Sequence, residues 1–325
     1  MAVQKLPQNK KTINGVLSQS LRKRIRNTLS ISVTKFIFIY MISGYACAGE
    51  IMKTNYSASF NSEAAFCLVK VNNILIMDSG DSSTGTMFGG QTISGLLENG
   101  ENTITISMVD EPFSQDGSGL TTNMACKVIV EKLFPGNKSE ILRTAELIVN
   151  DNKKIVPDNP DDKSIVNFGV SNRHFEDGAI EVTKKFWVDG LPEWSWTKAT
   201  LVTEQDIPKI KTFYEELHNA FKQKKLAKIK NMTGGAWDIL ATTQGGTSEM
   251  MWSSMDFKRY FDNGYKAVPI NWDEYELNTY KDKRIFRYEV GYSRISPIRI
   301  EDNEENSFNY NPYLSIIDGK VTVVH

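Results

Sequence analysis

The sequence of 325 residues has few of the side chains that build metal centres and nucleophilic active sites. Its cysteines and histidines, three of each, are Cys47, Cys67, Cys126, His174, His218 and His325. They are dispersed and show no metal-ligand spacing, so we expect no metal and no cofactor. The Gly-x-Ser-x-Gly elbow of hydrolases is also absent, and no histidine lies in a recognisable motif beside a nucleophile. These absences disfavour an enzyme.

Acidic residues are missing from one end of the chain. Residues 1–49 carry eight basic side chains and no aspartate or glutamate. Without those eight of the 38 basic residues, the remainder from Glu50 holds thirty basic against 39 acidic groups, a net charge of −9. A basic leader and an acidic body are therefore separate parts. The acidic body would repel phosphate, which disfavours nucleic acid as a partner.

No apolar run approaches the roughly 20 residues that a membrane-spanning helix needs. The leader offers only Phe36 to Ile42, after Lys35, followed by the small-x-small pattern Ala46-Cys47-Ala48. These features predict a signal peptide over residues 1–48, cleaved between Ala48 and Gly49, and a mature protein without a stable membrane span. The alternatives are a lipoprotein modified at Cys47 and an uncleaved membrane anchor.

The mature chain would keep two cysteines, Cys67 and Cys126, each inside a strand-like apolar run. An even number of cysteines in an oxidising compartment predicts a disulfide. Closing a loop of this length would stabilise the fold by about 4 kcal/mol in the chain-entropy model. The alternative is two free buried thiols.

Short strands separated by turn residues fill the sequence from Tyr56 to Phe134. Asn72-Asn73 lies between two apolar runs and predicts a tight hairpin. The run Thr103 to Met108 alternates, so Ile104, Ile106 and Met108 should face a core while the threonines face water. We predict an antiparallel β-sandwich domain over residues 49–135.

Residues 136–203 are predicted as a β-rich connecting region. Ile141 to Val149 and Ala179 to Val188 have strand composition, and a proline-rich acidic segment lies between them. This stretch is either a third piece of the β region or a joining segment.

From residue 204 the apolar spacing becomes helical. Ile210, Tyr214, Leu217 and Phe221 predict one helix, and Leu226 begins a second short one. Glycine pairs at 234–235 and 245–246 bracket a third helix, and Thr247 opens a fourth over 250–261. Strands are expected at 272–280, 285–292 and 297–300, with a closing hairpin turning through residues 318–319. Helices followed by antiparallel strands predict an α+β domain over 204–325, and a two-domain α+β chain overall.

Two turn patterns carry a resemblance to known families. Val71-Asn72 with Ile76, and Leu97 to Ile104 around Asn99-Gly100, resemble a small β-sandwich of bacterial envelope proteins. Helices leading into a sheet that ends in Asp318-Gly319-Lys320 look like the nuclear-transport-factor-2-like cone fold. Exported proteins with this pairing resemble periplasmic immunity and self-recognition proteins associated with type VI secretion effectors. The resemblance implies a periplasmic protein whose partner is a secreted toxin, and it supplies no catalytic residues.

Tryptophans and carboxylates are the candidate binding groups. Trp194 and Trp196 would point the same way on an extended segment, either as a binding anchor or as packing between the domains. Asp273, Glu274 and Glu276 flank Trp272 on a predicted strand. His218 is expected to be structural and His325 to be frayed.

The expected function is an exported, non-enzymatic binding protein that neutralises a secreted antibacterial effector. An acidic body suits a partner with a basic surface. The first alternative is an envelope glycan-binding module that uses the paired tryptophans. The second is a hydrolase or isomerase that uses a pocket in the cone-like domain.

Overall fold

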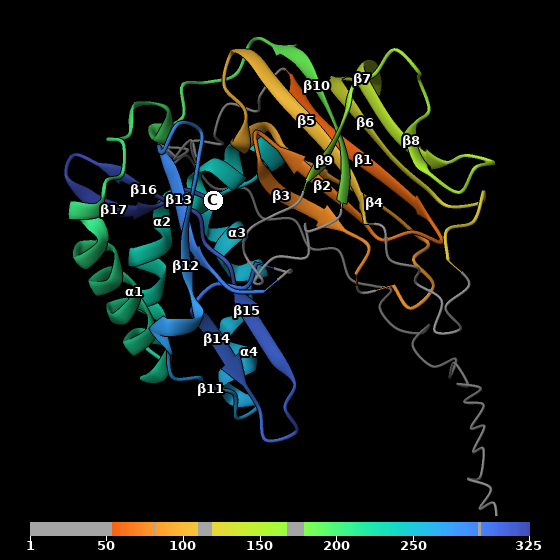
Figure 1. The fold of residues 1–325 in the computed structure, drawn as a ribbon. Helices are drawn as coiled ribbons and strands as arrows, with labels where there is room; N and C mark the ends of the chain where they lie inside the picture. The colour runs from red at the N-terminus through yellow and green to blue at the C-terminus, as the bar shows by residue number, and fades with distance from the viewer. Residues whose placement is uncertain (1–53, 81, 110–118, 168–178, 292–293) are drawn as a thin grey trace, which may run out of the picture. The chain divides into compact units, whose positions relative to one another are not determined.

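Antiparallel strands dominate the computed structural model, which describes residues 54–80, 82–109, 119–167, 179–291 and 294–325 (Figure 1). These described residues belong to one compact unit. The predicted signal peptide, its cleavage site at Ala48-Gly49, Cys47 and His174 lie outside them.

Two five-stranded antiparallel sheets form the N-terminal part. The first contains, in spatial order, β4 (Met87–Thr92), β1 (Asn55–Glu63), β6 (Ala125–Phe134), β7 (Lys138–Val149) and β8 (Ile155–Pro157). The second contains β3 (Ile74–Asp78), β2 (Cys67–Val71), β5 (Gly100–Val109), β10 (Ala179–Val188) and β9 (Ser164–Asn167). The predicted antiparallel, sandwich-like architecture is confirmed. The strands of the stretch 136–203 belong to these same two sheets.

Local chemistry explains the β2–β3 hairpin. Asn72 and Asn73 adopt φ values of 50° and 68°, the left-handed conformation that asparagine tolerates better than most residues. The side chain of Asn72 also binds the neighbouring strand, because its Oδ1 accepts from the Thr103 amide at 3.1 Å. The hairpin prediction is confirmed.

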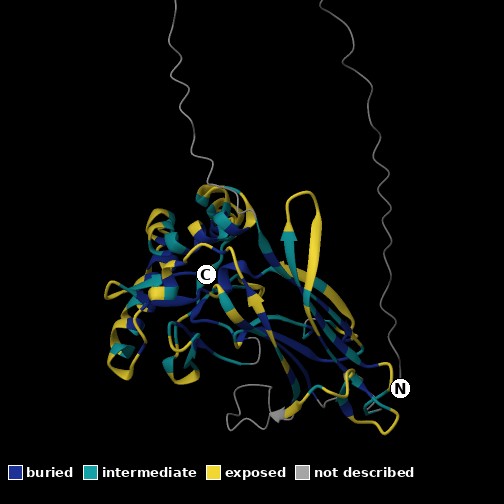
Figure 2. Cartoon of the chain, turned by 90° about the horizontal axis from the view of Figure 1, so that it is seen from above, coloured by how far each residue is buried: buried dark blue, intermediate teal, exposed yellow. Residues whose placement is uncertain are grey.

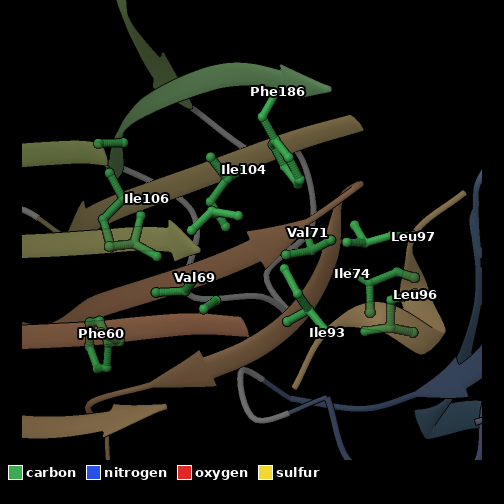
Figure 3. Packing of buried hydrophobic residues seen from close by; sticks show 14 of the residues in the cluster. Phe60, Val69, Val71, Ile74, Ile93, Leu96, Leu97, Ile104, Ile106 and Phe186 are labelled. Carbon is green, nitrogen blue, oxygen red and sulfur yellow. The ribbon is translucent and has the colours of Figure 1, made fainter. Parts of the chain in front are cut away.

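Alternating residues of both sheets fill the space between them (Figure 3). Phe60 comes from β1 of the first sheet, while Val69, Ile104 and Ile106 come from β2 and β5 of the second, and all are at most 1% exposed. Burying a side chain of this size contributes about 1.5–3 kcal/mol. The period-2 pattern of the sequence thus produces the core.

A disulfide joins the two sheets. Cys67 of β2 and Cys126 of β6 are bonded, with 5.8 Å between their Cα atoms, a usual separation for the bond. The predicted pairing is confirmed.

The threonines on the other face of the second sheet are expected to face water, but one of them is buried. Thr105 is 8% exposed, and its hydroxyl lies 2.8 Å from that of Thr183. Next to it, the Lys70 ammonium and the Glu181 carboxylate form a 2.7 Å ion pair, and Ser107 donates to the same carboxylate. The prediction is wrong at Thr105 because polar partners, rather than water, satisfy this face.

Helices follow the sandwich: α1 (Ile207–Lys222), α2 (Leu226–Gln244), α3 (Ser248–Ser254) and α4 (Phe257–Asp262). Two predicted boundaries need correction. Helix α2 runs unbroken through Gly234-Gly235, and the helix expected over 250–261 is two helices separated at Asp256, whose φ is 45°. The side chain of Thr247 caps α3 as expected, because it accepts from the Met250 amide.

Close packing explains the glycine in the middle of α2. A Cβ on Gly235 would lie 2.5 Å from the carbonyl oxygen of Val323, whereas one on Gly234 would meet nothing within 4 Å. Gly235 therefore lets the last strand approach the helix, and it does not end the helix.

Two antiparallel sheets complete the fold. One has the order β11 (Lys266–Ala267), β14 (Ile298–Glu301) and β15 (Ser307–Tyr310); the other has β12 (Glu276–Tyr280), β13 (Ile285–Glu289), β16 (Leu314–Ile317) and β17 (Lys320–Val323). The closing hairpin turns through Asp318 and Gly319 with φ values of 49° and 75°, as predicted. Rings pack in the core of this part, including stacked Phe221 and Tyr310 at 6.0 Å. The predicted α+β class is confirmed.

Glu98 connects the sandwich strands to the C-terminal sheets. Its carboxylate accepts two bonds from Arg284, at 2.9 and 3.0 Å, and one from Lys281 at 2.9 Å. Both cations also lie within 6 Å of the Trp196 ring. We call Glu98, Lys281, Arg284 and Trp196 the Glu98 clamp.

Buried segments run along the strands while loop and hairpin ends are exposed (Figure 2).

Candidate functional site

A surface built around Trp272 combines a fixed indole with exposed carboxylates. Trp272 belongs to a short 3-10 helix, Trp272–Glu274, that precedes β12. Helix α1 supplies Lys211 and Glu215 beside it. We call Trp272, Tyr275, Lys211, Glu215, Asp273 and Glu274 the Trp272 face.

Aromatic contacts hold the indole in place. The Trp272 ring lies 5.0 Å from the ring of Tyr288 and 6.2 Å from that of Tyr214, both in edge-on geometry. Its Nε1–H donates to Glu215 Oε1 at 3.3 Å, and the Lys211 ammonium lies 5.0 Å from the ring centre. Such edge-on pairs contribute about 0.5–1.5 kcal/mol beyond burial. Trp272 is only partly buried, so a preorganised indole remains available to a partner.

Carboxylates surround this indole. Glu215, Asp273 and Glu274 are exposed, and Glu274 accepts from the Asn271 side-chain amide at 2.8 Å. Burial raises the pKa of Tyr275, against the opposing effect of Arg299 and with a further rise from Glu274. Tyr275 is therefore a neutral phenol at physiological pH, and the exposed charge of the face is mainly negative.

The predicted strand over 272–280 is wrong in its first half. The Asn271 side chain accepts a hydrogen bond from the Asp273 amide and caps a 3-10 turn. This turn is a local alternative to strand pairing. Glu276 opens β12, partly buried, in register with Glu289 of β13. Asp273 and Glu274 still lie beside Trp272, on the turn instead of the strand.

The expected anchor of Trp194 and Trp196 needs correction. These residues are 5% and 0% exposed, and their Nε1–H groups donate to the carbonyls of Ser94 and Gly95 at 3.0 Å. The turn at 94–96 covers the two indoles and so removes their apolar area from water. The same turn supplies the two carbonyl acceptors. Of the three tryptophans in this stretch, Trp187 is the exposed one, at 70%.

Sequence reasoning missed a buried polar cluster on β13. Glu289, with a side chain 0% exposed, pairs with Arg287 at 2.7 Å and accepts from Tyr280 at 2.8 Å and Asn278 at 3.1 Å. Burial raises the pKa of Tyr280, which keeps this phenol a donor. In the sequence, charged residues at 287 and 289 alternate with Phe286 and Tyr288, which is the usual pattern of a solvent-facing strand. With its acceptors occupied, the cluster is suited to holding strands together.

Both described histidines contact the backbone of distant segments. An imidazole nitrogen of His218 lies 2.8 Å from the Val268 carbonyl oxygen. The His325 carbonyl accepts from the Tyr313 amide at 2.8 Å, and the preceding Val324 amide donates to the Tyr313 carbonyl, so the end of the chain is held, contrary to the expected fraying. Burial, with a contribution from Arg287, lowers the pKa of His325 to about 4.

The described residues contain no group of three or more histidine, cysteine or acidic side chains placed to hold a metal ion. Within the same part of the chain, no helix is both long and apolar enough to cross a bilayer. Searches with protein-family models, curated proteins and solved structures find no match to this chain.

Proposed function

We propose that this protein is an exported immunity protein that neutralises a secreted antibacterial effector by direct binding. The observation that carries the proposal is the Trp272 face, where a preorganised indole lies among exposed carboxylates. Tryptophan and tyrosine are the residues most enriched among interface hot spots. An indole already fixed by neighbouring rings loses little side-chain entropy on binding.

Charge supports a basic effector as the partner. The body from Glu50 carries a net charge of −9, and the exposed groups of the Trp272 face are mainly acidic. Complementary charge accelerates association and selects against acidic proteins. A basic toxin would meet Asp273 and Glu274 at the rim and Trp272 at the centre.

The disulfide supports the periplasm as the compartment. Bonds of this kind persist in oxidising environments and are rare in the cytosol of mesophiles. The Cys67–Cys126 bond is therefore consistent with an extracytoplasmic location. The basic leader and its Ala48-Gly49 cleavage site belong to the same proposal.

We further propose that residues 204–325 form a cone of the nuclear-transport-factor-2-like type. Helices that lead into antiparallel sheets support this assignment. The alternative of a hydrolase or isomerase needs a ligand-sized cavity within the cone. The Tyr310 ring packs there against Trp237 at 6.2 Å and against Phe257 at 5.6 Å, which favours binding through the surface.

The test is a pull-down from periplasm with tagged chain 49–325, at low and moderate salt. We expect one stoichiometric basic protein, retained at low salt and released as salt rises. The double variant Asp273→Asn/Glu274→Gln and the single variant Trp272→Ala should each lose it. The matched control, Glu304→Gln/Glu305→Gln, removes the same charge from an exposed loop and should retain the partner.

Protection of cells gives the second readout. The chain should protect cells that export the toxin encoded beside it, and Trp272→Ala should protect less well. Absence of protection by the unaltered chain would show that the proposed function is wrong. Equal loss of binding in the control variant would show that net charge, and not this face, determines binding.

A further inference from the structure

A groove on the sandwich is lined by cationic side chains and hydroxyls, although the chain from Glu50 onward is acidic as a whole. It has a volume of about 670 Å³, and its polar lining residues are Arg143, Lys184, Lys185, Thr103, Thr144 and Thr183. The volume falls within the range of ligand sites. The lining holds three cations and three hydroxyls, and it includes no acidic residue.

Strand pairing keeps the groove open. Strand β9 pairs with β10 only over Ala179 to Val182, so beyond Val182 no described strand pairs with that edge of β10. Strand β7 passes beside this edge, and Arg143 Nε donates to the Lys185 carbonyl. The register of β6 and β7 shifts between Val130 and Glu131, which redirects this end of β7.

The three cations of the groove differ in how readily they can bind an anionic ligand. Lys184 pairs with Asp162, and both side chains are largely covered. Lys185 pairs with Glu101 at 2.8 Å, but these side chains are 69% and 54% exposed, so the pair can exchange with another anion at little cost. The terminal nitrogens of Arg143 meet no acceptor among the described residues. Arg143 and Lys185 can therefore receive a carboxylate.

Trp187 flanks these cations. It follows Lys185 by two positions on β10, so the two side chains lie on the same face of the strand, roughly 7 Å apart along it. The indole is 70% exposed on a regular strand. An exposed indole beside cations and hydroxyls is suited to a ligand that is apolar on one face, hydroxylated at its edge and negatively charged.

We propose that the groove and Trp187 bind an acidic saccharide, a chain of sugars that carries carboxylates. One sugar ring stacks on the Trp187 indole, while Arg143 and Lys185 bind a carboxylate of the neighbouring sugar. The threonine hydroxyls of β5, β7 and β10 bond to sugar hydroxyls. This site is formed by sandwich residues alone and uses none of the residues of the Trp272 face.

Titration of the chain 49–325 with tetragalacturonate, and with neutral tetragalactose as the comparison, tests the proposal. We expect measurable, salt-sensitive binding of the acidic saccharide and at least tenfold weaker binding of the neutral one. Trp187→Ala should weaken tetragalacturonate binding at least tenfold. Arg143→Gln should weaken it several-fold and reduce, but not abolish, its salt dependence, because Lys185 remains. Because both side chains are exposed, the variants should keep the circular dichroism spectrum of the unaltered chain.

Two controls separate this site from the other surfaces. Phe88 is 79% exposed on β4, so Phe88→Ala removes an equally exposed ring and should leave binding unchanged. Asp273→Asn/Glu274→Gln should also leave it unchanged, which makes the outcome independent of the proposed effector site. Failure to bind tetragalacturonate, or full binding by Trp187→Ala, would overturn the proposal. Loss of a protein partner through Trp187→Ala, without saccharide binding, would instead make Trp187 a protein anchor.

Discussion

Glu98 shows how one side chain can connect two parts of a chain. Its carboxylate is largely covered and accepts from Arg284 and Lys281, which lie more than 180 residues away in sequence. Burial alone would raise the pKa of Glu98, but the bonds from Arg284 and Lys281 outweigh it, and the pKa is lowered. The charged form is thus the one that the folded state stabilises.

Replacing Glu98 by glutamine should lower the free energy of unfolding by about 3 kcal/mol at pH 7, because Lys281 and Arg284 would remain covered without their counter-charge. Chemical denaturation measures this difference. Because the pKa of Glu98 is lower in the folded than in the unfolded state, its contribution is complete above the unfolded-state pKa. It is lost as pH falls through the folded-state pKa. The gap between Glu98→Gln and the unaltered chain should therefore close in acid.

Glu193→Gln is the matched control, since Glu193 pairs with Lys198 at 2.7 Å while both side chains are more than 60% exposed. It should change stability by at most about 0.5 kcal/mol. Similar losses from Glu98→Gln and Glu193→Gln would contradict the role given to the Glu98 clamp.

At the scale of elements, Gly235 decides how closely α2 meets β17. Gly235→Ala would place a methyl group 2.5 Å from the Val323 carbonyl oxygen, so the helix or the strand must move. We expect a loss of about 1–3 kcal/mol, the usual cost of overpacking. Thermal and chemical unfolding measure it.

The neighbouring glycine gives a control of opposite sign. Gly234 also lies inside α2, but a methyl group there meets no atom within 4 Å. Gly234→Ala should therefore gain up to about 1 kcal/mol from helix propensity. If both substitutions stabilise the protein, close packing at Gly235 is not the reason for its glycine.

Elements set by local chemistry could be predicted from the sequence, and those set by distant contacts could not. Asn72-Asn73 and Asp318-Gly319 turn the chain by their own backbone preferences, so the sequence alone predicts both hairpins. Gly235 suggests a helix end when only its neighbours are considered, because its reason is the carbonyl of Val323.

The same division applies to the candidate site. Asp273 and Glu274 directly follow Trp272 in the sequence, a local relation that a turn preserves as well as a strand. Whether an indole is buried depends on partners elsewhere in the chain, as Trp194 and Trp196 show. The groove beside Trp187 needs the approach of β7, from one sheet, to β10 of the other, which no local spacing contains.

At the scale of the whole molecule, the disulfide constrains the unfolded chain. Cys67 and Cys126 are 59 residues apart, and releasing a loop of that size should cost about 4 kcal/mol in the chain-entropy model. The variant Cys67→Ala/Cys126→Ala should therefore unfold at markedly lower denaturant concentration.

Reductant provides the control for that variant. The unaltered chain in reductant should match the double variant, whose own stability should not respond to reductant. Equal unfolding free energies for the oxidised chain and the double variant would contradict the predicted contribution of the bond.

The strand order also determines when the sandwich can be completed as the chain emerges, N-terminus first. Strand β5 lies between β2 and β10, and β10 ends only at Val188. Both cysteines of the disulfide emerge earlier, so the bond can join the two growing sheets while one edge of β5 still lacks its neighbour. An open strand edge is a template for wrong pairing. A holding chaperone would therefore matter most after β5 has emerged and before β10 has emerged.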